Sequence, residues 1–279
     1  MVGTYSTGMT PERSLVVGMA VVALTVTALG CDDKKTSLAP AASSLAPSTP
    51  PPPGATTMKF AIDSASKTSL EMEAPKEKIK ATSTGGTGSL DVDLKKIESS
   101  RGEVKMDLTT LTTNTFENNP KDNAAQTTHA RTWLEVADGE SGKLDEAVKA
   151  TNRYAVYAIR SIENPSASDV TKLPATKEDG DDVRTVVMRT KGELLIHQHK
   201  VEREAEVEVK FHYPVGGDAT KPMWMGIKTK TPFHVVLAEH DVKPRDGFGK
   251  IAKQSFNLLG TKVADNAEIT LDLRAKAQP

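Results

Sequence analysis

Apolar and polar residues alternate with a period of two over much of the second part of the chain. In residues 201–211, VEREAEVEVKF, the alternation covers a full strand, with mostly charged residues at every second position. This pattern predicts strands of a sheet that has one buried face and one solvated face. The segments that we predict as strands on this basis are residues 59–63, 69–73, 89–94, 103–108, 183–196, 201–213, 223–239 and 267–276.

Helix is predicted in only two places. Residues 123–136 and 140–150 have helical composition, and in the second of them Leu144 and Val148 lie four positions apart. Residues 165–182 are rich in turn formers and are predicted as a long polar loop. About eight to ten strands with so little helix favour a closed or nearly closed antiparallel β-barrel, because closure removes exposed strand edges.

The N-terminal part of the chain has a different character. Residues 14–29, SLVVGMAVVALTVTAL, form an uncharged apolar run that follows Arg13. The run is shorter than the ~20 residues that span a bilayer, and it has the form of a signal-peptide core. We therefore predict that residues 1–30 are a signal peptide.

Residues 28–31, ALGC, resemble the lipobox of bacterial lipoproteins, and Cys31 is the only cysteine of the chain. The resemblance implies that the Cys31 thiol carries palmitate-type acyl chains, and that cleavage makes this residue the new N-terminus. It also implies a lipid-anchored protein of the bacterial cell envelope that faces the periplasm or the exterior. An ordinary secretory signal with an unrelated cysteine, and a short uncleaved anchor, stay open as alternatives.

A spacer follows the cysteine. Residues 36–57 are nearly all Ala, Ser, Thr and Pro, and such a segment cannot bury enough apolar surface to offset the entropy of ordering it. The predicted organisation is a signal peptide at 1–30, a lipidated Cys31 with a disordered linker at 31–57, and a β-barrel domain at 58–279.

Charge and motifs narrow the function. The chain has 36 Lys and Arg against 37 Asp and Glu, so its net charge of −1 gives no reason to expect nucleic acid as a partner. GxSxG, P-loop and GxGxxG motifs are absent from the sequence, so we predict no enzyme, no catalytic residue, no cofactor and no metal ligand. The oligomeric state stays open, a homodimer included.

Five short segments follow one another in a recognisable order, at residues 60–73, 84–90, 104–113, 122–134 and 192–201. Their order resembles that of the YceI family of periplasmic polyisoprenoid-binding proteins. The resemblance implies a lipocalin-like antiparallel β-barrel of about eight strands with one or two short helices, and an apolar, polyisoprenoid-type lipid as ligand. The chain departs from the family at 153–159 and in an extra segment at 138–152, and residues 232–249 match it only loosely.

An eight-stranded barrel can hold one slender apolar ligand or be filled by its own side chains. The sequence leaves both readings open, and a filled barrel would suit an envelope interaction protein without a ligand. The apolar residues that we predict to face inward and to line a ligand cavity are Leu194, Ile196, Val207, Phe211, Trp224 and Phe233.

A third reading rests on His197 and His199. Two histidines at i and i+2 of a strand point the same way, and with Glu204 they resemble half of a cupin metal site. His212 and His234 could approach, which keeps a cupin-like metal enzyme open. The pair falls at the tip of a predicted hairpin, however, and we interpret both residues as solvated turn histidines.

Overall fold

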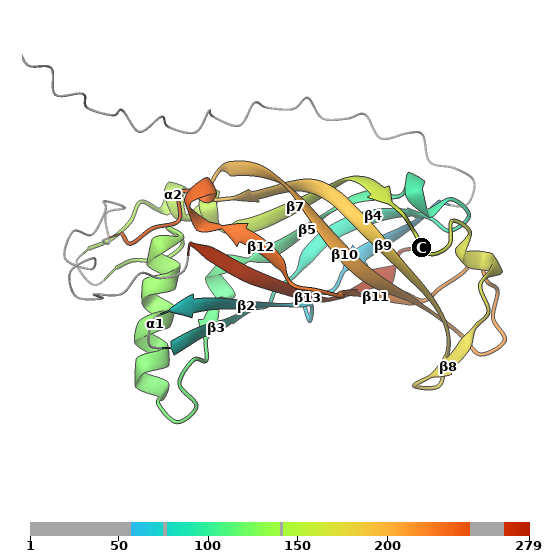
Figure 1. The fold of residues 1–279 in the computed structure, drawn as a ribbon, viewed down its shortest axis with the longest axis horizontal. Helices are drawn as coiled ribbons and strands as arrows, with labels where there is room; N and C mark the ends of the chain where they lie inside the picture. Colours follow the sequence, from blue (N-terminus) through green and yellow to red (C-terminus); the bar gives the residue numbers. More distant parts are fainter. Residues whose placement is uncertain (1–56, 75–76, 140–141, 246–264) are drawn as a thin grey trace, which may run out of the picture. The chain divides into compact units, whose positions relative to one another are not determined.

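A computed structural model describes residues 57–74, 77–139, 142–245 and 265–279. Eight antiparallel strands close into a ring, because β13 pairs with β11 along one edge and with β1 along the other. The ring is drawn in Figure 1. The ring strands are β1 (Thr57–Ile62), β4 (Thr87–Asp93), β5 (Arg101–Asp107), β7 (Tyr154–Glu163), β9 (Asp181–Ile196), β10 (His199–Tyr213), β11 (Trp224–Thr229) and β13 (Asn266–Ala277).

Shorter strands lengthen the ring strands at one end. β2 (Lys67–Ala74) continues β1 along the same edge of β13, and β3, β6 and β12 continue β4, β5 and β11 in the same way. Counted with these extensions, the strands follow one another around the ring in chain order, which is the up-and-down order of lipocalin-like barrels. The remaining short strands are β3 (Glu77–Ser83), β6 (Thr112–Thr113), β8 (Thr176–Glu178) and β12 (Phe233–Val236).

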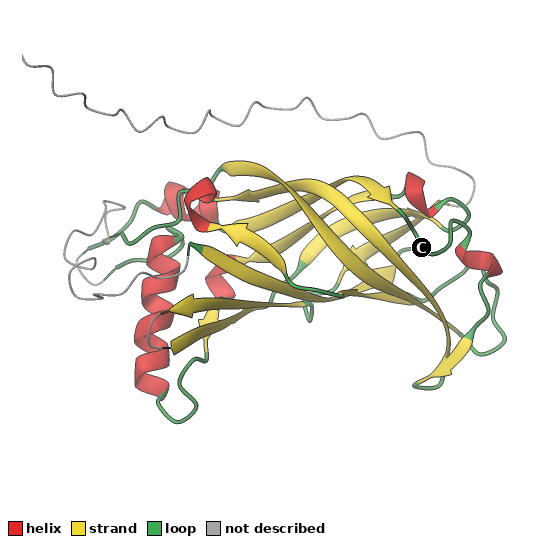
Figure 2. Ribbon diagram, in the orientation of Figure 1, coloured by secondary structure: helices red, strands yellow, loops and turns green. Residues whose placement is uncertain are grey.

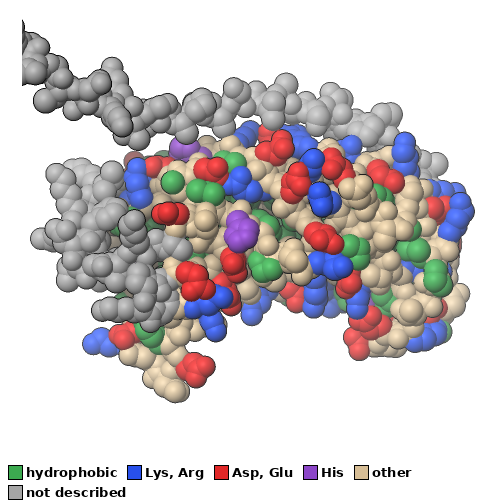
Figure 3. Space-filling model, viewed as in Figure 1, with side chains coloured by type: hydrophobic (Ala, Val, Ile, Leu, Met, Phe, Trp, Pro, Cys, Tyr) green, Lys and Arg blue, Asp and Glu red, His purple; other side chains and the backbone are tan. Residues whose placement is uncertain are grey.

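The β9–β10 hairpin is the longest paired segment of the ring, and its register runs without interruption from His199 opposite Ile196 to Tyr213 opposite Asp182. Along β10, Ala205, Val207, Val209 and Phe211 are buried, whereas the intervening residues are charged and partly exposed. The period-two alternation of the sequence thus corresponds to an inner and an outer face. On the face shown in Figure 3, acidic and basic side chains are interspersed over these strands.

The two helices lie at the end of the ring where the short strands extend it (Figures 1 and 2). α1 (Pro120–Trp133) begins with an Asn119 cap and a proline in its first turn, and α2 (Glu146–Asn152) begins with an Asp145 cap. Neither described helix is long and apolar enough to cross a membrane. Single 3₁₀ turns occur at η1 (Ile97–Ser99), η2 (Leu108–Thr110), η3 (Val170–Lys172) and η4 (Leu237–His240).

The predicted fold class is confirmed, with differences in detail. The single strand predicted at 223–239 is divided into β11, β12 and the 3₁₀ turn η4, since the chain bends before Phe233, next to Pro232. The loop predicted at 165–182 contains η3 and β8. Strands β3 and β7 were not among the predicted strands. EKIKATS contains a single large apolar residue, and the run YAVYAI at the start of β7 has no alternation of apolar and polar residues.

Candidate functional site

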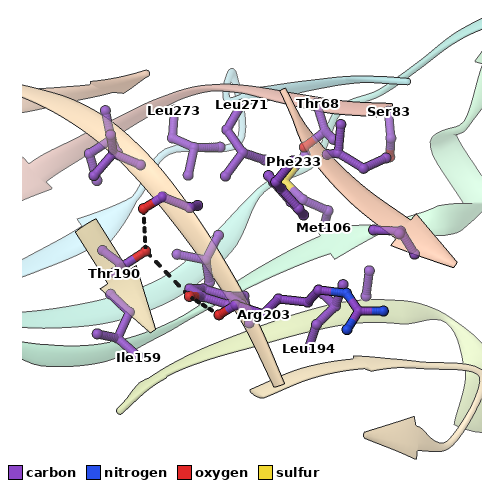
Figure 4. A pocket seen from close by; sticks show the side chains of 18 of the residues that line it. Thr68, Ser83, Met106, Ile159, Thr190, Leu194, Arg203, Phe233, Leu271 and Leu273 are labelled. Atoms are coloured by element: carbon purple, nitrogen blue, oxygen red, sulfur yellow. Dashed lines mark hydrogen bonds between the residues drawn. The ribbon is translucent and has the colours of Figure 1, made fainter. Parts of the chain in front are cut away.

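The ring encloses a cavity of about 200 Å³. Its walls come from β4, β5, β7, β9, β10, β11 and β13 and from the extensions β2, β3 and β12, and they are mostly aliphatic. Figure 4 shows side chains from several of these strands converging on it, among them Leu194, Phe233 and Leu271. A dry apolar cavity of about 150 Å³ holds a benzene molecule, so this volume is sufficient for a stretch of hydrocarbon.

One end of the ring is filled and the other is hollow. Tyr213, at the end of β10, and Ala275 on β13 are fully buried and do not line the cavity. Toward the other end of the same strands, Arg203 and Leu271 point inward, line the cavity and are only partly buried. The cavity therefore extends toward the tip of the β9–β10 hairpin.

Five of the six predicted lining residues border the cavity: Leu194, Ile196, Val207, Phe211 and Phe233. The prediction was wrong for Trp224, which does not line it. The Trp224 ring stacks on His212, with ring centroids 3.4 Å apart, and carries the guanidinium of Arg274 above it at 4.1 Å. The next residue, Met225, takes the inward position. Met223, Trp224 and Met225 are consecutive apolar residues, so the sequence shows no apolar–polar alternation here that would identify the inward-facing residue.

An arginine side chain lines this apolar cavity. Arg203 shares the inward face of β10 with Ala205 and Val207, and its side chain is 16% exposed. Its Nη1 donates to the Glu202 carbonyl at 2.8 Å, and its Nη2 is paired with Glu239. The Nε–H is buried and has no hydrogen-bond partner among the described residues. The Nε–H group of Arg203 is thus a strong hydrogen-bond donor without a partner among the described residues at the cavity wall.

His240 supplies an acceptor at the same wall. The ring is fully buried and lines the cavity, and its Nδ1 lies 3.0 Å from the carbonyl oxygen of His199. Burial lowers the pKa of His240, and the charge of Arg203 lowers it further, so the ring is neutral at neutral pH. Because Nδ1 must donate to the carbonyl, Nε2 carries the lone pair, and it has no partner among the described residues.

Tyr157 holds the backbone of Arg203 in place. Its hydroxyl donates to the Arg203 carbonyl at 3.0 Å and lies 3.3 Å from the Thr190 hydroxyl. Burial raises the pKa of Tyr157 to about 12, which keeps the phenol protonated as a donor. The ring lies against Gly192, where a Cβ would come within 2.7 Å of it, so only glycine leaves the space. We call Arg203 and His240 the polar pair of the cavity.

Sequence reasoning missed the polar pair. The sequence did contain a signal for Arg203. In a strand that was predicted correctly, Arg203 lies two positions from both Val201 and Ala205 and therefore faces the same side as they do. His240 had no such signal, because it lies in the 3₁₀ turn η4 beyond the last predicted position of its strand. Only the folded chain places η4 against the hairpin.

The interpretation of both hairpin histidines as solvated is wrong for His197. That side chain is 7% exposed and its Nε2 is hydrogen-bonded to Glu135, whereas His199 is exposed. The half-cupin arrangement does not assemble. Glu204 is paired with Lys191 on the outer face, and His212 is bonded to Asp181 and stacked on Trp224. His234 is exposed on β12.

No protein-family model and no curated protein sequence matches the chain. Among solved structures, it is similar to a polyisoprenoid-binding domain from Saccharophagus degradans implicated in plant cell wall breakdown, with 12% identity and a TM-score of 0.49 over 79% of this chain and 99% of that one. BcnA of Burkholderia cenocepacia has 12% identity and a TM-score of 0.44 over 77% and 99% of the two chains. A mutant CJ YceI protein with a monobromobimane guest has 11% identity and a TM-score of 0.36 over 71% and 85%.

Proposed function

We propose that the chain binds one slender apolar lipid of the polyisoprenoid type inside its barrel, with a small neutral head group at the polar pair. The observation that carries this proposal is the apolar cavity of about 200 Å³ with an unpaired donor and an unpaired acceptor at its wall. A barrel that served only as a scaffold would be filled at both ends.

The head group decides the preference for the barrel over a membrane. A hydrocarbon tail gains ~0.8 kcal/mol for each buried CH₂ when it leaves water, but it gains the same in a bilayer. The net preference must then come from hydrogen bonds at the cavity wall. Since Arg203 Nε donates and His240 Nε2 accepts, a hydroxyl or a carboxamide satisfies both, whereas a phosphate offers only acceptors.

The membrane anchor is part of the proposal. Cys31 lies outside the described residues, and its acylation rests on the lipobox resemblance of residues 28–31. Several acyl chains would hold the chain stably at a membrane of the bacterial envelope. The barrel would then remain beside the source of its lipid.

Mass spectrometry of the full chain, purified from a bacterial envelope, tests both parts. Under native conditions we expect a stoichiometric hydrophobic adduct that is lost on denaturation, with a mass that fits an alcohol or an amide. Under denaturing conditions we expect the mass of a chain that begins at Cys31 and carries its covalently bound acyl chains. A bare native mass would overturn lipid binding, and an unacylated cysteine would overturn the anchor alone.

Substituting Arg203 with methionine tests the head-group assignment. A hydrogen bond to a charged group contributes about 1.5–3 kcal/mol, so the variant is expected to bind farnesol roughly 10- to 100-fold more weakly. Binding of the matched hydrocarbon farnesene should not change, and competition in the same native spectra measures both. Arg101→Met is the matched control, because Arg101 also lines the cavity but already donates to the carbonyls of Glu98 and Ser100. Equal weakening of alcohol and hydrocarbon would contradict the assignment.

A further inference from the structure

We propose a divalent transition-metal site at the tip of the β9–β10 hairpin, formed by His197, His199 and Asp241. One candidate ligand atom from each of the three lies within 4.8 Å of the others. This site differs from the half-cupin pattern of the sequence, because its carboxylate comes from the residue after η4 and not from β10. We infer this metal site independently of the proposed lipid binding.

The environment of His197 carries the inference. This imidazole is 7% exposed, and its Nε2 is bonded to the Glu135 carboxylate. Its Nδ1 is buried and has no partner among the described residues. In the neutral tautomer that donates its Nε2 proton to this carboxylate, Nδ1 carries a lone pair, and metal-binding histidines have this same carboxylate–imidazole arrangement. Without a metal, an unpaired buried acceptor of this kind is unfavourable.

The backbone brings the other two ligands to that nitrogen. His197 and Gln198 both have positive φ, 49° and 65°, and form the two-residue turn of the hairpin, so His199 follows directly after it. The hydrogen bond between His240 Nδ1 and the His199 carbonyl, at 3.0 Å, holds η4 against the hairpin. Asp241 comes next and adopts the left-handed conformation with φ 52°.

The charges at the site are balanced before any metal binds. The carboxylates of Glu135 and Asp241 face Lys243 and Arg245. The Asp241 carboxylate is paired with Lys243 through one oxygen and with Arg245 through the other. A cation must displace Lys243 from this carboxylate, and the Lys243 side chain, which is 35% exposed, can move into solvent.

Two imidazoles and one carboxylate suit Zn²⁺ and neighbouring divalent ions, and they leave a fourth position for water. Zinc–ligand bonds of about 2.0–2.1 Å place tetrahedral ligands roughly 3.3 Å apart, so the cluster must contract by at most about 1.5 Å. The exposed His199 side chain can supply that movement by rotation. Because Asp241 follows His240 directly, a bound ion would also hold the polar pair of the cavity in place.

Zinc titration of the metal-stripped full chain tests the site. The Cys31→Ser background is used, so that no thiol can bind the ion. We expect one equivalent of Zn²⁺ by calorimetry, a higher Tm when it is bound, and the visible absorption of tetrahedral Co²⁺ on substitution. His199→Ala and Asp241→Asn should each weaken binding at least tenfold. Lys243→Gln should strengthen it, because the competing cation is removed.

His234→Ala is the matched control, since His234 is an exposed histidine outside the cluster. The His234→Ala variant should bind zinc with the same affinity as the parent chain. Glu135→Gln should weaken binding about 10- to 100-fold through the orientation of His197. The absence of a one-to-one zinc complex would overturn the site. So would an affinity that is the same in His199→Ala as in the parent chain.

Discussion

Substituting Ala205 with phenylalanine is expected to abolish the hydrophobic adduct in native mass spectra and to leave the stability of the barrel unchanged or raised. Ala205 is 6% exposed, faces inward on β10 between Arg203 and Val207, and lines the cavity. A phenyl ring at this position fills the space of the lipid beside the polar pair. Burial of such a side chain contributes about 1.5–3 kcal/mol when the space is already there.

Ala275→Phe is the matched control for this substitution. Ala275 is fully buried on β13 at the filled end and does not line the cavity. The same ring must there displace packed atoms, at a cost of typically about 1–3 kcal/mol. Opposite changes in Tm for the two variants would distinguish a hollow end from a filled one. An adduct that persists in Ala205→Phe, or an equal destabilisation by both substitutions, would contradict the cavity as the lipid site.

Phe211→Ala is expected to destabilise the chain by about 3–5 kcal/mol, measured by urea unfolding followed by circular dichroism. The ring is fully buried and belongs to the core cluster with Phe60, Val186 and Met225. Truncation removes the buried area and leaves a space that the strands of a closed ring cannot collapse to fill.

The outer face of the same strand provides the comparison. Glu208 is three residues before Phe211 and points outward, so Glu208→Ala is expected to change the free energy of unfolding by no more than about 0.5 kcal/mol. Similar effects of the two substitutions would mean that β10 does not have the inner and outer faces described for it.

Much of the barrel could be predicted from alternation alone. In β10 a charged residue occupies nearly every second position, so the buried set of Val207, Val209 and Phe211 follows from the period of the strand. The same reasoning identified Leu194 and Ile196 on β9 as lining residues. It failed at Trp224, where neighbouring apolar residues leave the parity undefined.

Arg203 shows that a charged residue in a strand does not always occupy a solvent-exposed position. Its parity placed it inside, but the strong preference of arginine for solvent made the residue look like part of the outer charged row. The fold tolerates it there because Glu239 pairs with one end of the guanidinium at the open side of the cavity.

The sequence by itself predicted antiparallel strands with one buried face, and the inward positions of Leu194, Ile196, Val207, Phe211 and Phe233, because strand periodicity is a local property. Only the tertiary structure decided whether the ring is hollow, because that depends on how side chains from all its strands fill a common volume. It also decided which polar atoms meet at the hairpin tip. His240 and Asp241 reach His199 and His197 across more than 40 residues of chain through the placement of η4, and no local pattern encodes that contact.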